Sequence, residues 1–190
     1  MDVAYYSRLH KGSQPPKLPE RYLVEDTALP VQVREVCGAY HHDFVQAATA
    51  GLGVLFLGRA RTWKTAGAVS LAFALWKTYN IPTRFVSMPS ALLDLELDRF
   101  GPGTKATIAK WRTCPLLLLD DFGAAQPGSF GHTVLQAILA ARFDAQLPTL
   151  LTANISATKD TVTPDLAKLY GPLLARRLLD ASAGYTVLCG

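Results

Sequence analysis

From about residue 50 onward, short apolar runs alternate with longer segments in which apolar residues recur at helical spacing. This alternation is typical of a parallel sheet whose two faces are both covered by helices. We therefore predict an α/β fold with a five-stranded parallel sheet. The expected strands are Val54–Leu57, Thr83–Ser87, Leu116–Leu119, Thr149–Thr152 and Tyr185–Cys189. The expected helices are Pro30–Ala50, Lys64–Tyr79, Ser90–Phe100, Thr104–Arg112, Ser129–Gln146 and Asp165–Ala181.

The first thirty residues differ in composition from the rest of the chain, because they contain four prolines among polar and basic residues. Such a segment is expected to be extended and to lie over the surface of the domain. We predict an N-terminal arm at residues 1–30, a candidate for binding a partner. Residues 31–190 show no internal repeat and no break in composition, so they are expected to form one domain.

Composition narrows the class of protein. The chain has 190 residues, 49% of them apolar and 18% charged, which is enough to bury about 70% of the surface of the unfolded chain. The longest nearly uncharged stretch, Ala66–Trp76, is shorter than the roughly 20 residues of a spanning helix. The first twelve residues contain no apolar segment of a secretory signal. We therefore expect a cytoplasmic protein without a membrane contact.

Net charge and cysteine content restrict the class of protein less than length and hydrophobicity do. The 19 basic and 15 acidic residues give a net charge of +4, which is compatible with a nucleic-acid partner without requiring one. Cys37, Cys114 and Cys189 lie far apart in the sequence, and their spacing matches neither a zinc site nor a disulfide framework. We expect reduced, packed thiols.

One loop has the context of a phosphate-binding P-loop, since it follows an apolar strand and opens a long helix. The motif G-x-x-x-x-G-K-[ST] places backbone amides around phosphate oxygens, a lysine beside them and a hydroxyl on Mg²⁺. Trp63 stands where the motif has its second glycine. The loop consists of Gly58, Arg59, Ala60, Arg61, Thr62, Trp63, Lys64 and Thr65.

Trp63 is expected to weaken nucleotide binding. A side chain held at positive φ costs about 1–2 kcal/mol, and an indole can occupy space meant for phosphate. The indole itself is expected to pack against the neighbouring helix, although Arg59 and Arg61 with Trp63 could instead contact DNA. The alternative for the whole segment is a glycine turn followed by a surface helix.

Two adjacent carboxylates, Asp120 and Asp121, follow the run of four leucines at Leu116–Leu119. Carboxylates at strand ends of such sheets point into the ligand crevice. Asp120 is then a candidate Mg²⁺ residue and Asp121 a candidate for polarising an attacking water. The alternative is an exposed acidic turn.

Two further elements carry polar groups. Asn154 follows the strand Thr149–Thr152 and could orient a water or sense a phosphate, or it could simply form a turn. Arg176 and Arg177 lie side by side in a C-terminal helix. An arginine there could reach a neighbouring subunit as an arginine finger, or it could belong to a solvated basic face.

In order and spacing, these elements resemble the DnaC/IstB-like AAA+ ATPases. The loop ending in Lys-Thr, the run LLLLDDFG, the strand TLLTAN and the terminal ARRLLD look like that family's Walker A, Walker B, sensor 1 and arginine-finger elements. Together with the opening LPERY, the resemblance covers about residues 18–190. It implies a P-loop AAA+ core with an absent or minimal lid.

The resemblance also implies roles by position. Lys64 and Thr65 would contact phosphate and Mg²⁺, Asp120 and Asp121 would form the Walker B pair, Asn154 would be the sensor and Arg177 the finger. Arg142 matches a basic position of the family without an assigned role. The departures are Arg61 and Trp63, where the family usually has glycines.

Family members load replicative helicases or guide transposases, so two functions follow. The first is a helicase-loader-like AAA+ protein of DNA replication that uses ATP or ADP and Mg²⁺. Its implied partners are a replicative helicase or a transposase, DNA with the single-stranded form favoured, and further copies of the chain. The alternative is a catalytically weak or inactive AAA+ adaptor, or a transposition helper. Whether the chain is an ATPase is left open because of Trp63 and Arg61.

Overall fold

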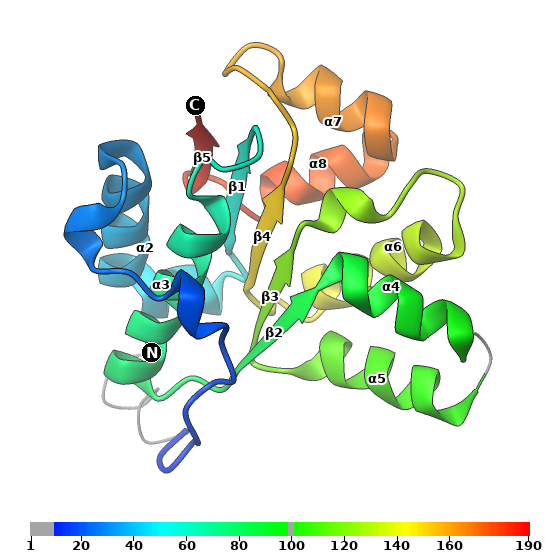
Figure 1. The fold of residues 1–190 in the computed structure, drawn as a ribbon, viewed down its shortest axis with the longest axis horizontal. Helices are drawn as coiled ribbons and strands as arrows, with labels where there is room; N and C mark the ends of the chain where they lie inside the picture. Colours follow the sequence, from blue (N-terminus) through cyan, green and yellow to red (C-terminus); the bar gives the residue numbers. More distant parts are fainter. Residues whose placement is uncertain (1–9, 99–100) are drawn as a thin grey trace.

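A computed structural model describes residues 10–98 and 101–190 of the chain. At its centre lies a parallel sheet with the strand order β2-β3-β4-β1-β5 (Figure 1). The strands are β1 (Val54–Gly58), β2 (Thr83–Ser87), β3 (Leu116–Asp120), β4 (Thr149–Ala153) and β5 (Thr186–Cys189). The predicted α/β fold and parallel five-stranded sheet are confirmed.

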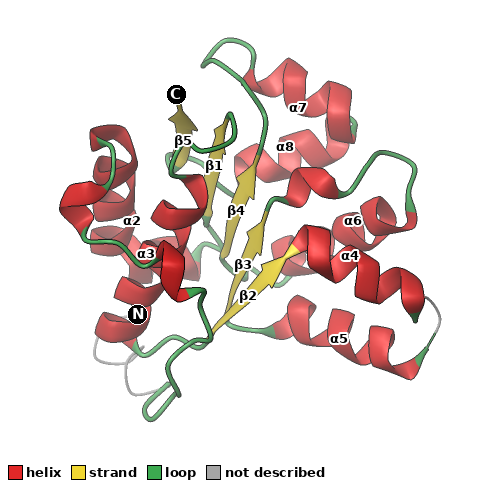
Figure 2. Cartoon of the chain, in the orientation of Figure 1, coloured by secondary structure: helices red, strands yellow, loops and turns green. Residues whose placement is uncertain are grey.

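Helices cover both faces of this sheet (Figure 2). One face carries α2 (Val31–Thr49) and α3 (Lys64–Tyr79), and the other carries the remaining α-helices of the described residues. These are α4 (Met88–Leu97), α5 (Pro102–Thr113), α6 (Phe130–Asp144), α7 (Val162–Tyr170) and α8 (Pro172–Asp180). Short 3₁₀ turns form η1 (Glu20–Tyr22), η2 (Asp26–Ala28) and η3 (Phe122–Ala124). Phe100, the expected end of one helix, lies outside the described residues.

The uninterrupted leucines of β3 are explained by the two covered faces. Leu116 and Leu118 belong to the core under α2 and α3, whereas Leu117 and Leu119 belong to the core on the opposite face. All four are 0% exposed. Because successive side chains of a strand point to opposite faces, only a strand buried on both sides needs such a run.

The prediction of one helix over Asp165–Ala181 is wrong. The chain forms α7 and α8 there, separated at Gly171, which has φ 81°. Pro172 then occupies the first position of α8, where its missing N–H is not needed. Inside a continuous helix the same proline would remove a hydrogen bond and clash with the preceding turn.

Residues 10–30 lie along α3. The Trp76 indole Nε1–H donates to the Ser13 carbonyl at 3.3 Å, and the Val24 amide donates to the Ser70 hydroxyl at 3.4 Å. Leu29 is only 4% exposed and belongs to the core under α2. Residues 1–9 of the predicted arm lie outside the described residues, and the arm's partner-binding role stays a prediction.

Two expectations from composition concern thiols and membranes. Cys37, Cys114 and Cys189 are free, and the first and last are buried. Burial raises the pKa of Cys37 to about 12 and that of Cys189 to about 11, so both are unreactive at neutral pH. Across the helices of residues 10–98 and 101–190, none is both long and apolar enough to span a bilayer.

Candidate nucleotide site

A cavity of about 450 Å³ opens at the edge of the sheet where β1, β3 and β4 end. Because these strands are parallel, their carboxyl ends gather at one edge, where ligands bind in open α/β sheets. The volume lies within the usual range for small-molecule sites. Of the predicted site residues, the lining includes Ala60, Arg61, Thr62, Trp63, Lys64, Thr65, Asp120, Asp121 and Asn154.

The loop between β1 and α3 has the backbone of a phosphate cradle. Arg61 has φ 64° and Trp63 has φ 67°, both in the left-handed region. These are the two positions where glycine was expected, so each carries the strain of a side chain at positive φ. Consecutive amides turned in this way form an anion-binding concavity. The chain therefore keeps the shape of the loop without glycine at these two positions.

Gly58 at the start of the loop is required for a different reason. A Cβ built on it would lie 2.0 Å from the carbonyl oxygen of Cys189 in the adjacent strand β5. No larger residue fits at that distance, so Gly58 allows β1 and β5 to approach each other where the loop begins.

Lys64 is held inside the loop. Its side chain is 6% exposed, and its ammonium donates to the Arg59 carbonyl and, at 3.3 Å, to the Thr62 hydroxyl. Burial lowers the pKa of Lys64, while the nearby acidic groups of Cys189, Asp121 and Asp120 act to raise it. An anion entering the cavity would restore favourable surroundings for this ammonium.

Asp120 sits at the centre of a hydroxyl network. Its Oδ1 accepts hydrogen bonds from the Thr65 hydroxyl and the Thr152 hydroxyl, each at 2.7 Å. Thr152 Oγ1 also accepts from the Asp121 amide at 2.9 Å. Sequence reasoning missed Thr152 as a site residue. The available signal was its spacing, since it lies two positions before Asn154 and so points to the same side of the chain.

The backbone conformation of Asp121 and one hydrogen bond fix the position of its carboxylate. It stands in the left-handed region at φ 54°, and its Oδ1 accepts from Asn154 Nδ2 at 3.0 Å. Burial and then the charge of Asp120 raise the pKa of Asp121, while Lys64 opposes the shift. A carboxylate with increased proton affinity is suited to accept a proton from water. Strained backbone at such a residue is common at functional sites.

These residues fit a magnesium nucleotide. The Thr65 hydroxyl and the Asp120 carboxylate meet at 2.7 Å, and hard oxygen ligands of this kind are those that Mg²⁺ takes together with phosphates and waters. The cradle and the buried ammonium of Lys64 lie beside them. No group of three or more His, Cys, Asp or Glu capable of holding a metal occurs among the described residues.

Solved structures show where this architecture recurs. The DnaC helicase loader superposes with a TM-score of 0.75 at 19% identity, over 89% of this chain and 99% of that one. DnaI gives 0.71 at 20% identity, over 90% and 94%. The chain has the AAA+ fold of these helicase loaders. A replication initiator, DnaA bound to AMPPCP and single-stranded DNA, gives 0.69 at 14% identity over 90% of this chain and 50% of that chain. No protein-family model and no curated protein matches the sequence.

Trp63 lines the cavity and keeps 44% of its surface exposed. Packing of its indole against the neighbouring helix stays a prediction. Trp63 is exposed because it precedes α3 as its N-cap residue and does not belong to the buried face of the helix. The apolar stripe of α3 that packs on the sheet starts further along, at Ala66.

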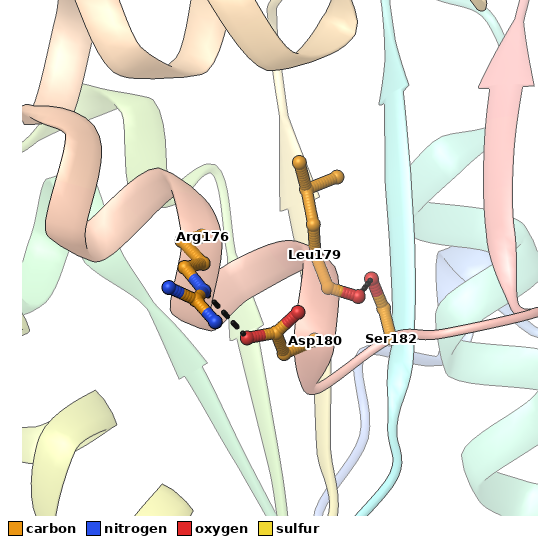
Figure 3. A network of polar contacts seen from close by, with 4 residues as sticks. All are labelled: Arg176, Leu179, Asp180 and Ser182. Atoms are coloured by element: carbon orange, nitrogen blue, oxygen red, sulfur yellow. Dashed lines mark hydrogen bonds and ion pairs between the residues drawn. The ribbon is translucent and has the colours of Figure 1, made fainter.

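Arg177 does not reach the cavity of its own chain. It is half-buried beside a second, very small cavity of about 20 Å³ that also includes Thr149 at the start of β4. Arg176 is 82% exposed and pairs with Asp180 at 3.5 Å (Figure 3). A finger role for either arginine therefore requires a neighbouring subunit, and Arg177 stays a prediction.

Arg142, which sequence reasoning left without a role, braces the opposite end of the sheet. It is 1% exposed. Its guanidinium donates to the carbonyls of Trp111 at 3.0 Å, Cys114 at 2.8 Å and Pro148 at 2.6 Å, and to the Thr149 hydroxyl at 2.9 Å. A cation at the last carbonyls of α5 is favoured by the helix dipole. Arg142 therefore ties α5 to α6 and β4 and does not contact the nucleotide site.

Proposed function

We propose that this chain is a helicase-loader-like AAA+ protein that acts in DNA replication and binds ATP or ADP with Mg²⁺ in the 450 Å³ cavity. The observation that carries the proposal is the network beneath the loop, in which Thr65 and Thr152 meet on Asp120 and Asn154 donates to Asp121. These five hydroxyl, amide and carboxylate side chains converge where a terminal phosphate and its metal would lie. A buried lysine completes the set.

Each residue has a role in this proposal. Lys64 neutralises the phosphates, and the amides of the loop from Gly58 to Trp63 surround them. Thr65 and Asp120 hold Mg²⁺, which offsets the phosphate charge when bound. Asp121 accepts the proton of an attacking water that Asn154 orients. We expect hydrolysis to be slow, because Arg61 and Trp63 replace the two glycines.

The proposed partners are a replicative helicase, DNA with single strands favoured, and other copies of the chain. Assembly is supported by the position of Arg177, which lies away from the cavity of its own chain. In an oligomer, Arg177 of one subunit would complete the site of the next, as an arginine finger does in other nucleotide hydrolases.

A second candidate is a non-catalytic AAA+ adaptor, or a transposition helper that recruits a transposase to DNA. The observation that favours an adaptor is the pair of strained side chains in the loop, Arg61 at φ 64° and Trp63 at φ 67°. Against it stands the intact network on Asp120, which an adaptor would not need for assembly.

Isothermal titration calorimetry with Mg²⁺-ATP separates the candidates. We expect the wild-type chain to release heat on binding and Lys64→Met to release none, because the buried Lys64 ammonium is the cation proposed to neutralise the phosphates. Lys77→Met, the same change at the other end of α3, is the matched control and should bind as the wild type does. If the wild-type chain does not bind Mg²⁺-ATP, the nucleotide-binding proposal is wrong and the non-catalytic adaptor is favoured.

Co-purification addresses the partner. A replicative helicase and a transposase from the same genome are each mixed with the tagged chain, with and without Mg²⁺-ATP. Retention of the helicase supports the loader, whereas retention of the transposase alone supports the transposition helper.

A further inference from the structure

The loop residues Arg59–Trp63 include exposed basic and aromatic side chains, and Arg61 and Trp63 line the cavity. Arg59, Ala60 and Arg61 are exposed, and Trp63 is 44% exposed. The sequence from Gly58 to Ala66 contains three basic residues and no acidic one. Nucleotide binding uses the backbone amides of this loop and the buried Lys64, so the proposed function does not account for the outward side chains.

We propose that the surface Arg59–Trp63 binds a single strand of nucleic acid, with Trp63 stacking on a base and the two arginines pairing with its phosphates. Aromatic stacking and arginine–phosphate pairing are the two contacts by which proteins hold single strands. The inference rests on the proposed function, which names single-stranded DNA as a partner, and it adds the residues that would hold the strand and a loop that the strand shares with the nucleotide.

Trp63 is suited to stacking by its strained conformation. A tryptophan at φ 67° carries a conformational penalty that burial in the core does not offset, since almost half of its side chain faces solvent. Among the described residues, Trp63 and Phe143 are the exposed side chains of the large apolar aromatic kind. Arg142, which precedes Phe143 in the sequence, is buried, whereas Arg59 and Arg61 near Trp63 are exposed.

The surroundings of the loop add positive charge. Arg21 lines the same cavity, and its guanidinium lies 4.9 Å from the centre of the Tyr22 ring. The nearest acids of the cavity, Asp120 and Asp121, are engaged by Thr65, Thr152 and Asn154. Arg21, Arg61 and Trp63 therefore line one cavity, where a bound strand would contact them together.

Fluorescence anisotropy with a labelled dT20 tests the inference. We expect Trp63→Ala to weaken dT20 binding about five- to a hundredfold, the range found when stacking side chains are replaced by alanine. Trp63→Phe should retain most of the affinity, and Phe143→Ala should bind as the wild type does. Circular dichroism of each variant confirms that it is folded.

Salt dependence identifies the phosphate contacts. Arg61→Gly keeps the left-handed backbone and removes one cation, so the slope of log K against log salt should become shallower by about 0.7. Arg112→Ala, the same loss of charge at the other edge of the sheet, should leave the slope unchanged. If Trp63→Ala binds dT20 like the wild type, or a 20-base-pair duplex binds as tightly as dT20, the inference is wrong. Binding of rU20 that is equally sensitive to Trp63→Ala supports the surface and names RNA as a second ligand.

A competition experiment tests whether dT20 and Mg²⁺-ADP bind to the same loop. Saturating Mg²⁺-ADP should weaken dT20 binding to the wild type, because both ligands contact the loop. If Mg²⁺-ADP does not bind at all, the proposed nucleotide function fails, and the dependence of dT20 binding on Trp63 is still measured. Simultaneous, independent binding of both ligands would refute the shared loop.

Discussion

Replacing Trp63 separates two effects that the sequence joins, the strain of the backbone and the bulk of the indole. Trp63→Ala removes the indole and keeps a Cβ at φ 67°. Trp63→Gly removes the Cβ as well. Comparison of the two variants with each other therefore reports on strain, and comparison of Trp63→Ala with the wild type reports on the ring.

We expect the strain to act on folding and not on binding. The Lys64 ammonium donates to the Arg59 carbonyl and the Thr62 hydroxyl, and these contacts hold the loop in the conformation in which Arg61 and Trp63 are left-handed. The penalty of about 1–2 kcal/mol per residue should therefore be present in the free protein. Since glycine also loses more chain entropy on folding, we expect Trp63→Gly to be about 1 kcal/mol more stable than Trp63→Ala. For a chain of this length that difference raises the melting temperature by about 2–4 °C.

Nucleotide affinity should then be the same in both variants. Calorimetric titration with Mg²⁺-ADP measures the dissociation constants, and thermal unfolding monitored by circular dichroism measures the stabilities. A dissociation constant at least fivefold lower for Trp63→Gly than for Trp63→Ala, equivalent to about 1 kcal/mol, would refute the reasoning. It would mean that the free loop relaxes and has to be strained again when the nucleotide binds.

Three further predictions concern the network and the brace. Arg142→Met should lower the free energy of unfolding by about 2–5 kcal/mol, because it leaves several buried acceptors without a donor; urea denaturation measures this, and unchanged stability would exclude the brace. Asp121→Asn should alter the pH dependence of stability. Burial raises the folded-state pKa of Asp121 above its ordinary value of 3.8, so its stabilising contribution is present below that value and is lost as the pH rises through the folded-state pKa. The stability of Asp121→Asn relative to the wild type should therefore increase from about pH 3 to pH 7, and a constant difference would contradict the shift. Thr152→Val, which keeps the shape and removes the hydroxyl between Asp120 and Asp121, should lower stability by about 1–3 kcal/mol and weaken Mg²⁺-dependent nucleotide binding; binding equal to the wild type would show that the network is only structural.

The sequence alone determined the strands of the sheet and the acidic and amide residues that line the cavity, Asp120, Asp121 and Asn154. Leu116–Leu119 could be identified as a strand because four consecutive apolar residues are needed only where both faces are covered. Asp120, Asp121 and Asn154 could be placed together because the carboxyl ends of parallel strands share one edge. These inferences depend on the local pattern of apolar and polar residues and on the regular geometry of a parallel sheet. The pattern can be read from the sequence, and the geometry is the same in every parallel sheet.

The tertiary structure decided what depends on contacts between distant segments. Arg142 became a brace only when α5 and β4 were seen to place their carbonyls around it. Thr152 became a site residue only when its hydroxyl met Asp120 from another strand. The exposure of Trp63 also had to be seen, because no periodic pattern says how a loop residue turns. Contacts of this kind join residues about thirty positions apart, and their geometry is set by how whole helices and strands pack.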